Sequence, residues 1–456
     1  MWAQAERSSD ILLSKHKAKS LGLDADMMVR TKANPTLLRN ARVIDVLDGE
    51  HLARASVVIE GDRITSLGRG NDVSVPEGAV SVDLEGMTII PGLIDSHLHL
   101  WGLNSDRVID ELLMVPDGVR LIRTTQRLHR LLEAGYTTVK DCGGINALQI
   151  KRAIAEGTIE GPRVIAAGYF LSQTFGHGDF FHFLPMEMVD ARRTRGGSNL
   201  TCDGVAECSK AARYALREGA DFIKISTSGG VMSERDRSEH VQFTSEEVRA
   251  MVRVAQNAGT FVTAHCHSAE GMHMSVDAGV HTIDHALYPD PEVIEKAKKK
   301  EVVFVSTLSI MKRYNEGGVA AGYPEWAVRK SRMAWEKAIA NIRAIYNSGA
   351  LLAAGTDFLD SPLMQMGTNA LELELLVEFC GLSPLDALRA GTFNGAKACG
   401  LGERIGALRT GMTADIVVCK KDPLKDIRYL QKPDMVRMVL KEGRTVLNRG
   451  PAPKPV

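Results

Sequence analysis

The feature that most constrains this chain is a repeated pattern in its middle, where apolar, β-branched runs alternate with stretches of helical periodicity. Eight such runs occur between residues 91 and 402: LIDSHLHL, TTVKDC, RVIAAGYF, DFIKIST, TFVTAHCH, HTIDHA, VVFVSTLS and LLAAGTD. Helical stretches follow most of them, at 118–134, 205–217, 245–257, 291–299 and 326–346. Strands that alternate with helices pair in parallel. Eight units of this kind predict an α/β fold, a closed (β/α)8 TIM barrel rather than an open sheet.

Both ends of the chain have a different pattern. Residues 36–90 and 403–456 alternate apolar and polar residues between Gly and Asp turns, which is typical of short antiparallel strands. The two pieces predict one small β-sandwich domain built from both chain ends, with the barrel at 91–402 between them. Residues 1–35 are polar and basic without a strong period. We interpret them as an N-terminal extension, either an arm of an oligomer or a disordered segment.

Composition excludes several classes of protein. Lys plus Arg and Asp plus Glu both number 56, so the formal net charge is zero, which argues against nucleic-acid binding through bulk positive charge. No apolar run reaches the roughly 18 residues of a membrane span, and the first residues, MWAQAERSSD, lack the apolar stretch of a signal peptide. The seven Cys form no CxxC pair, which indicates free thiols. We therefore expect a cytoplasmic protein with no nucleic-acid or membrane partner.

Side chains suited to metal binding stand at the ends of five of the eight runs, where a barrel places its active site. His97 and His99 are two residues apart in a strand, so both imidazoles face one side and can bind one metal ion. Taken singly, Lys224 suits an ion pair and Asp357 suits a helix cap. Together the residues favour a metal site, because independent structural roles do not explain their shared position. The full set is His97, His99, Lys224, His265, His285 and Asp357.

These residues, in this order, resemble the motifs of the amidohydrolase superfamily. PGLIDSHLHL at 91–100, the strand-four Lys, the His of strands five and six and the strand-eight Asp all match, and so does the phrase GALRTGMTAD at 406–415. The resemblance covers about residues 36–450. Within the superfamily, LSQTFGHGDFF at 171–181 and IKISTSGGVMS at 223–233 are similar to the imidazolonepropionase-related branch. That branch includes Xaa-Pro dipeptidases and carboxypeptidases, the ochratoxin-hydrolysing amidase and enzymes that open phenylurea and thiocarbamate bonds.

The resemblance implies a site with two divalent metal ions. One ion would lie between the strand-one histidines and Asp357, and the other between His265 and His285. Lys224 would bridge them as N6-carboxylysine, because burial near two cations favours the neutral amine, which can take up carbon dioxide. Zinc suits this set of ligands, although manganese or cobalt also fits. Relatives form homo-oligomers, so the resemblance also implies self-association.

The reaction that the resemblance implies is hydrolysis by a metal-activated hydroxide. Paired ions about 3.5–4 Å apart share one water and lower its pKa, and the resulting hydroxide attacks a carbonyl carbon. Asp357 would take the proton of this water and pass it to the leaving nitrogen.

Two further histidines and one loop are candidates for substrate contact. His267 lies two residues after a ligand and faces the same side of its strand, so we assign it to carbonyl or substrate binding rather than to a purely structural role. His177 lies in GHGD at 176–179, where the flanking Gly residues allow a tight loop. We assign it to substrate contact or gating rather than to loop stability. The small-residue loop 226–230 either offers backbone donors to a substrate or serves turn geometry alone.

Several loops after the strands carry apolar side chains that could line a pocket, although ordinary loop packing explains them equally well. An aromatic pocket would favour a hydrophobic acyl or aryl group next to the scissile C–N bond. Arg192, Arg193 and Arg195 either bind a substrate carboxylate or form a solvated basic loop. The sequence thus leaves a C-terminal amino-acid amide and an uncharged aryl urea or carbamate both open. The apolar candidates are Trp101, Phe170, Phe175, Phe180, Phe181, Phe183, Leu363, Met364 and Met366.

We therefore predict a binuclear metal hydrolase that cleaves an amide-like C–N bond (amide, peptide, urea or carbamate) of a small molecule with a hydrophobic or aromatic group. C–N bonds other than peptide bonds are favoured over peptide bonds. One alternative is a mononuclear aminohydrolase that deaminates a heterocycle, but such enzymes generally lack the strand-four lysine, so Lys224 argues against it. Another is a non-catalytic interaction protein that kept the fold, and the complete set of expected ligands argues against this one.

Overall fold

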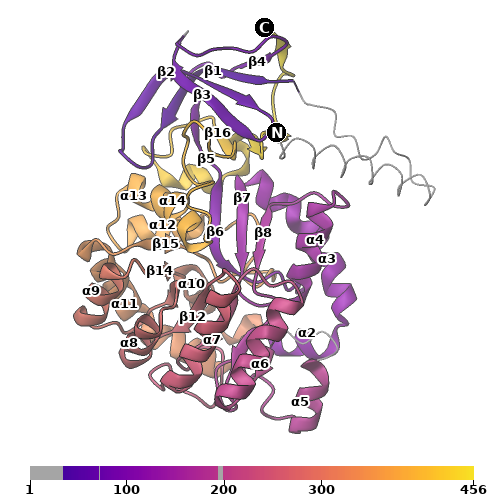
Figure 1. The fold of residues 1–456 in the computed structure, drawn as a ribbon, viewed down its shortest axis with the longest axis vertical. Helices are drawn as coiled ribbons and strands as arrows, with labels where there is room; N and C mark the ends of the chain where they lie inside the picture. The colour runs from indigo at the N-terminus through magenta and orange to yellow at the C-terminus, as the bar shows by residue number, and fades with distance from the viewer. Residues whose placement is uncertain (1–33, 71, 194–198) are drawn as a thin grey trace, which may run out of the picture.

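The computed structural model describes residues 34–70, 72–193 and 199–456, without the side chains of residues 190–193. The predicted extension at 1–35 therefore lies outside the described residues, apart from its last two. Figure 1 shows two parts stacked along the long axis. A β-rich part at the top contains both indigo and yellow strands, and a larger part of strands and helices lies below it.

Strands from both ends of the chain meet in one nine-stranded sheet. They are β1 (Thr36–Ile44), β2 (His51–Glu60), β3 (Arg63–Arg69), β4 (Val80–Asp83), β5 (Thr88–Pro91), β16 (Ile416–Cys419), β17 (Val436–Lys441), β18 (Arg444–Asn448) and β19 (Lys454–Pro455). β5 joins the two ends, because it pairs with β1 in parallel and with β16 antiparallel. Val57, Ile89 and Val418 belong to a buried cluster of their own, which accounts for the alternating pattern at both ends.

The middle of the chain forms parallel strands that are mostly buried. They are β6 (Leu93–Leu98), β7 (Tyr136–Asp141), β8 (Arg163–Ala166), β9 (Phe170–Ser172), β10 (Asn199–Thr201), β11 (Ile223–Ser226), β12 (Val262–Cys266), β13 (Thr282–His285), β14 (Val303–Ser306) and β15 (Leu352–Ala354). β6–β8 form one parallel sheet and β9–β15 another. The sheets are linked on both sides, since Leu98 bridges in parallel to Phe358 and the Asp221 N–H donates to the Ala166 carbonyl. This is an α/β fold with parallel strands, consistent with a (β/α)8 barrel.

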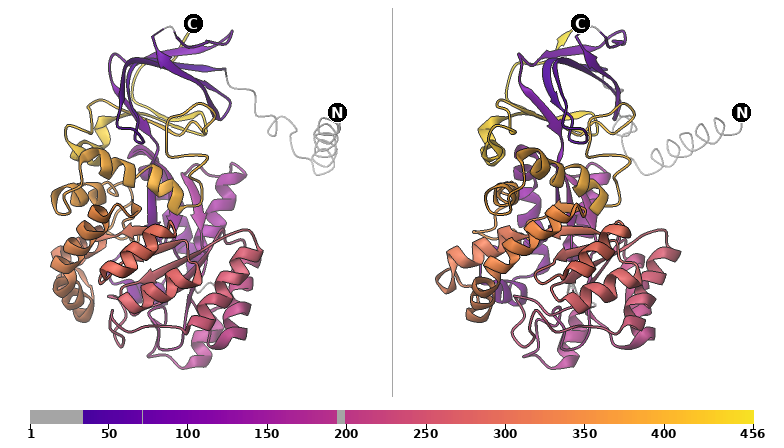
Figure 2. Two further views of the ribbon diagram at one scale, coloured as in Figure 1. Left: turned by 60° about the vertical axis from the view of Figure 1, so that its left-hand side comes forward. Right: turned by 90° about the vertical axis from the view of Figure 1, so that its left-hand side faces the viewer.

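Helices follow most of these strands and lie around them in both views of Figure 2. They are α2 (Val108–Met114), α3 (Asp117–Glu133), α4 (Ile145–Ala155), α5 (Met186–Arg193), α6 (Gly204–Arg217), α7 (Ser245–Asn257), α8 (Ala269–Ala278), α9 (Pro291–Lys299), α10 (Leu308–Gly317), α11 (Glu325–Ser348), α12 (Leu371–Glu378), α13 (Pro384–Ala390) and α14 (Phe393–Ala398). The predicted helices correspond to α3, α6, α7, α9 and α11. Local signals fix some starts: Thr244 and Glu247 form a capping box at α7, and Asp290 caps α9 ahead of Pro291.

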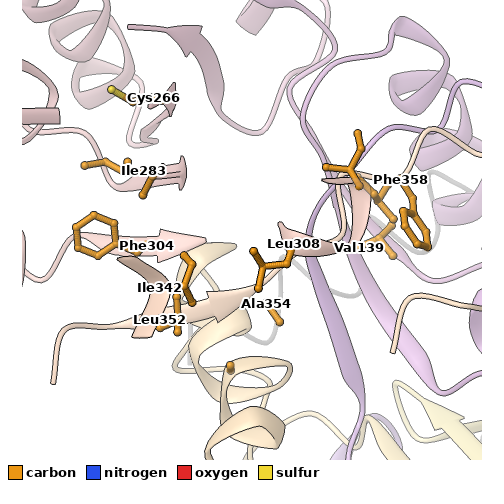
Figure 3. Packing of buried hydrophobic residues seen from close by; sticks show 14 of the residues in the cluster. Val139, Cys266, Ile283, Phe304, Leu308, Ile342, Leu352, Ala354 and Phe358 are labelled. Carbon is orange, nitrogen blue, oxygen red and sulfur yellow. The ribbon is translucent and has the colours of Figure 1, made fainter. Parts of the chain in front are cut away.

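The main core lies between the parallel strands and the helices outside them (Figure 3). Ile283, Phe304 and Leu352 are neighbours in register across β13, β14 and β15, and each is at most 3% exposed. Ile342 of α11 belongs to the same cluster. Because these strands are covered on both faces, their sequences are continuous apolar runs rather than alternating ones.

Two of the eight predicted runs differ from the structure. The third run is not one strand: it breaks between β8 and β9, where Gly168 adopts a left-handed φ of 67° that an extended strand cannot continue through. The end of the seventh run is helical, because α10 begins at Leu308. The β-branched and apolar residues of this run do not by themselves indicate where the strand ends and the helix begins.

All seven cysteines lie among the described residues, and each is buried and free, as the sequence predicted. Among the helices that the structure describes, none combines the length and the apolar character needed to cross a lipid bilayer.

Candidate metal centre at the carboxyl ends of the strands

His97, His99 and Asp357 converge where β6 and β15 end. The Nε2 atoms of His97 and His99 lie 3.4 and 3.2 Å from the same oxygen, Oδ1 of Asp357. The backbone fixes this meeting, because the Asp357 N–H donates to the carbonyl of His97 at 2.7 Å. One possible ligand atom from each residue lies within 4.8 Å of the other two, a spacing that can hold a metal ion.

Lys224, His265 and His285 face the same cavity from the neighbouring strands β11, β12 and β13. The ring centroids of His265 and His285 are 4.5 Å apart, and the His285 ring lies 4.8 Å from that of His97. All six residues that the sequence singles out as metal ligands line one cavity of about 510 Å³. The structure therefore brings the six side chains together, although they come from five strand ends far apart in the chain.

The electrostatics of this cluster suit a divalent cation. Burial lowers the pKa of His265 and His285 well below the ordinary value, so these imidazoles are neutral and have a lone pair to offer a metal. Burial alone would raise the pKa of Asp357, but His97 and His99 hold it well below its usual range, so the carboxylate is anionic. The neutral imidazoles of His265 and His285 and the anionic carboxylate of Asp357 fit a metal of the zinc, manganese or cobalt type. Burial alone would lower the pKa of His97, but its acidic neighbours raise it well above the ordinary value, so this imidazole would release a proton on binding a metal.

The second ring nitrogen of two histidines is held by a neighbouring group. His99 Nδ1 lies 2.8 Å from the carbonyl oxygen of Gly143, and His285 Nδ1 lies 2.7 Å from the hydroxyl of Thr307. Such partners fix the orientation and the tautomer of an imidazole and leave Nε2 for the metal. Sequence reasoning missed both partners, because a backbone carbonyl and a threonine carry no distinctive signal in the sequence.

Asp284 is a further functional residue that sequence reasoning missed. Its fully buried carboxylate contacts Nζ of Lys224 and lies 2.9 Å from Nδ1 of His97. A signal for it was present, because Asp284 is a charged residue inside an apolar strand, as Lys224 is. Asp284 thus orients one candidate ligand and neutralises the charge of another.

Backbone strain is concentrated in the same place. His285 and Asp357 adopt left-handed φ angles of 73° and 57°, which are uncommon for residues other than glycine. Each such conformation costs of order 1–3 kcal/mol and persists where the surrounding structure requires it, often at a functional site. The strain here turns both side chains into the cavity.

His177 and His267 also lie at the cavity. The His177 ring stacks on that of His265 with centroids 4.1 Å apart, and its Nδ1 lies 2.8 Å from the hydroxyl of Ser233. Nδ1 of His267 is buried and has no hydrogen-bond partner among the described residues. Both histidines line a second cavity of about 490 Å³ that adjoins the metal ligands. Their position is that of groups able to meet a substrate.

Three backbone N–H groups of the loop 226–230 donate to other protein groups. The N–H groups of Thr227, Gly229 and Gly230 donate to the His265 carbonyl, to the His240 carbonyl and to a carboxylate oxygen of Asp236. Of the two alternatives that the sequence left open, these three donors favour turn geometry, because protein groups already accept from them.

The aromatic candidates separate into two groups. Those that line the cavity with the metal ligands are Trp101, Phe170 and Phe180. Phe175 and Phe183 are 54% and 50% exposed and do not line it, and Phe181 packs against the main core. Of the basic candidates, the side chains of Arg192 and Arg193 and the whole of Arg195 lie outside the described residues.

For the apolar residues that follow Asp357, the sequence left pocket lining and loop packing equally open, and the structure shows packing. Met364 and Met366 are buried in the main core, and Leu363 packs against it. The chain turns away from the cavity here, because the Leu363 N–H donates to the buried carboxylate of Asp106. A sequence pattern does not distinguish a methionine that faces a core from one that faces a cavity.

Three comparisons relate the chain to known proteins. The sequence pattern of the amidohydrolase family matches residues 88–446. The ochratoxinase of Aspergillus niger is 34% identical over 421 residues, which are 89% of this chain and 85% of that protein. Its solved structure has a TM-score of 0.82 at 30% identity and covers 92% of this chain and 97% of that chain.

Two other relatives are similar over most of their length. A prolidase solved as a complex with N-methylphosphonate-L-proline has a TM-score of 0.84 at 30% identity, covering 91% of this chain and 100% of that chain. The imidazolonepropionase of Deinococcus deserti is 25% identical over 406 residues, 83% of this chain and 88% of that protein.

Proposed function

Because the chain belongs to the amidohydrolase family, we propose that it is a metal-dependent hydrolase that cleaves an amide-like C–N bond of a small molecule. The resemblance predicted from the motifs is thereby confirmed at the level of the family. The observation that carries the proposal is the convergence of His97, His99 and Asp357, with their ligand atoms within 4.8 Å of one another.

The site would hold two divalent ions, most simply zinc, with manganese or cobalt as substitutes. The strand-one histidines and Asp357 would bind one ion, and His265 and His285 the other, with Lys224 as a bridging N6-carboxylysine. When bound, such a pair of ions supplies an acidic water and polarises a carbonyl group. Lys224 suits the bridging role because it is 2% exposed yet lines the cavity, so its amine is both shielded and reachable by carbon dioxide.

The remaining work falls to side chains of this chain. Asp357 is anionic and faces the cavity, so it can accept a proton from water and return it to the leaving nitrogen. His267 has an unpartnered Nδ1 at the cavity wall and would bind the carbonyl oxygen or another polar group of the substrate. His177, whose Nδ1 lies 2.8 Å from the Ser233 hydroxyl, would contact the substrate from the loop after β9.

The substrate would be a small molecule with a hydrophobic or aromatic group. Trp101, Phe170 and Phe180 on one side of the ligands, and Ile310 and Met311 on the other, give the two adjoining cavities apolar walls. Because an ochratoxinase and a prolidase are both relatives, both amide and peptide bonds belong to the class of bonds that we propose as targets. Within this class we favour C–N bonds other than peptide bonds.

The architecture proposed with this function is a barrel at 91–402 and a β-sandwich formed by 36–90 and 403–456, after an extension at 1–35. The pairing of β5 with β16 supports the sandwich, because it joins the two chain ends. We also propose a homo-oligomer in the cytoplasm, which size-exclusion chromatography and fractionation would test.

The test is a metal count together with a substrate screen. Elemental analysis should find about two ions per chain, and at least one of N-acyl amino acids, Xaa-Pro dipeptides, aryl ureas or carbamates should be hydrolysed. Chelation should abolish that activity. His265→Ala should lose metal, whereas His129→Ala, at an exposed position on α3, should not. One ion per chain with deamination of a heterocycle, or activity unaffected by chelation, would overturn the proposal.

A further inference from the structure

We propose that a second, apolar chamber beside the candidate metal centre is an outer substrate pocket, which receives an uncharged aliphatic or aryl group attached to the scissile amide. The inference rests on the proposed function and extends it by naming where the distal part of the substrate binds. The chamber has an empty volume of about 470 Å³, part of which is open to solvent. It is lined by α2, by Trp326 of α11 (Glu325–Ser348) and by loops that follow three different strands.

The lining of the chamber is almost wholly apolar. Val108, Ile109 and Leu112 of α2 form one side, and Phe183 and Trp326 contribute to the others. Apolar surface of this kind binds hydrocarbon groups in proportion to the area that both lose to water. A monomeric fold has no need to leave such a space open, because interiors are close-packed.

The chamber and the metal cavity share a wall of three side chains. Trp101, Phe180 and Met232 line both spaces. Trp101 is fixed, because its Nε1 donates to the Gly143 carbonyl at 2.6 Å and its ring lies 4.6 Å from that of His99. The chamber therefore begins directly behind a residue that touches the candidate metal ligands.

Met232 is the part of the wall that can move. Its backbone is held by Trp326, whose Nε1 donates to the Met232 carbonyl at 3.0 Å. Its side chain is partly buried against the main core, and its sulfur accepts a weak hydrogen bond from the Tyr314 hydroxyl at 3.6 Å. An unbranched thioether with three rotatable bonds adapts its shape at low cost. A substrate chain can therefore pass from the metal cavity into the chamber by displacing one flexible side chain.

The charged side chain at the edge of the chamber already has a partner. His182 and Glu234 line it and contact each other at 3.1 Å, and the Glu234 side chain is 48% exposed. The Glu234 carboxylate therefore lies at the solvent edge, and the described lining of the chamber contains no other acidic side chain and no Lys or Arg. The chemistry of the chamber thus selects an uncharged apolar group.

The experiment uses the metal-loaded protein and three anilides, acetanilide, butyranilide and hexananilide, with aniline release as the readout. In the wild type, kcat/KM should rise about fourfold per added methylene while the chain enters the chamber, and at least about tenfold over the series. Ile109→Trp, at a half-buried position, should fill the chamber and remove most of this increase. The matched control is Ile122→Trp on α3, where the side chain is 59% exposed, and it should keep the wild-type dependence.

The outcomes separate this inference from the proposed function. No dependence on chain length in the wild type, or an equal dependence in Ile109→Trp, would overturn the chamber as a pocket while leaving the hydrolase intact. If no anilide is hydrolysed, calorimetric binding of the same three compounds decides. Binding that tightens with chain length in the wild type but not in Ile109→Trp supports the chamber even though the hydrolase proposal fails for this bond, and length-independent binding overturns it.

Discussion

Two lysines are buried among the parallel strands, and their surroundings differ. Lys140 on β7 is fully buried, and its Nζ donates to the hydroxyls of Thr263 and Thr282 at 2.8 and 3.3 Å. It also lies over the Phe222 ring, 4.8 Å from the centroid. Lys224 on β11 contacts the carboxylate of Asp284 and lines the metal cavity. One lysine is enclosed by the core, and the other faces the site.

This difference shows that burial alone does not mark a reactive lysine. The neutral hydroxyls and the aromatic face around Lys140 satisfy an ammonium group and leave it no space for a reagent. Asp284 connects the two regions, because Thr282 donates to its other oxygen at 3.1 Å. If Lys224 becomes an anionic carbamate, Lys140 is the nearby cation that still supports the buried Asp284 carboxylate. The comparison supports the chemical role that we propose for Lys224 and a role in charge balance for Lys140.

The largest effect is expected from Lys224→Ala. Metal affinity should fall by more than about 100-fold, since even groups that only orient ligands contribute 10–100-fold. Turnover should disappear with the metal. Elemental analysis and any activity found in the screen provide the measurements. Partial rescue by acetate, which can occupy the vacated space with a carboxylate, would support the bridging role, and retention of both ions with full turnover would refute it.

Asp357→Asn should separate chemistry from metal binding. The amide keeps the shape of the carboxylate but cannot accept a proton, so turnover should fall by about 10²–10⁴-fold. At least one ion per chain should remain, because the other ligands are intact. The variant is compared with the wild type by kcat and metal content measured on the same sample. Turnover near the wild-type level would exclude Asp357 as the proton acceptor.

The sequence predicted which six side chains meet in one cavity, because two strong rules apply to them. His97 and His99 follow the two-residue period of a strand, and barrel strands end at one face. Asp357 and Lys224 stood out as polar residues in apolar runs. Asp284 carried the same signal but was missed, because its role depends on a contact with Lys224 some 60 positions earlier, which no local pattern reveals.

What the sequence left open or predicted wrongly has a common physical cause. Met364 and Met366, for which pocket lining and packing were both open, lie in the core, and three backbone donors of the loop at 226–230 already have protein acceptors. Gly168 broke a run that was expected to be one strand. The sequence shows which residue types a segment contains. It does not show which way a side chain or a backbone N–H group points, because that depends on tertiary contacts.

A smaller effect is expected from Lys140→Met, which tests the structural half of the comparison. The substitution keeps the length of the side chain but removes the hydrogen bonds to Thr263 and Thr282, so the free energy of unfolding should fall by about 1.5–3 kcal/mol. Metal content should stay at the wild-type level. Denaturant unfolding and elemental analysis measure both quantities, and Lys224→Met is the matched control with the opposite expectation. Loss of metal in Lys140→Met without loss of stability would reverse the assignment.

The smallest expected effect is a change in how the stability of the protein depends on pH. It tests whether His177 at the candidate site is enclosed, as the core around Lys140 is. Burial lowers the pKa of His177 to about 4, whereas a histidine in an unfolded chain titrates near about 6.5. Between these values the unfolded state binds a proton that the native state does not, so the stability of metal-free protein should fall as the pH drops.

The share of His177 in this slope is at most about 1.4 kcal/mol per pH unit. His177→Gln should reduce the slope between about pH 6.5 and pH 4, and His129→Gln on the exposed face of α3 should leave it unchanged. Denaturant unfolding of the chelated protein across this range gives the slopes. If wild type and His177→Gln lose stability equally as the pH falls, His177 is open to water in solution. The loop after β9 that carries His177 would then be more exposed than the stacked pair of His177 and His265 implies.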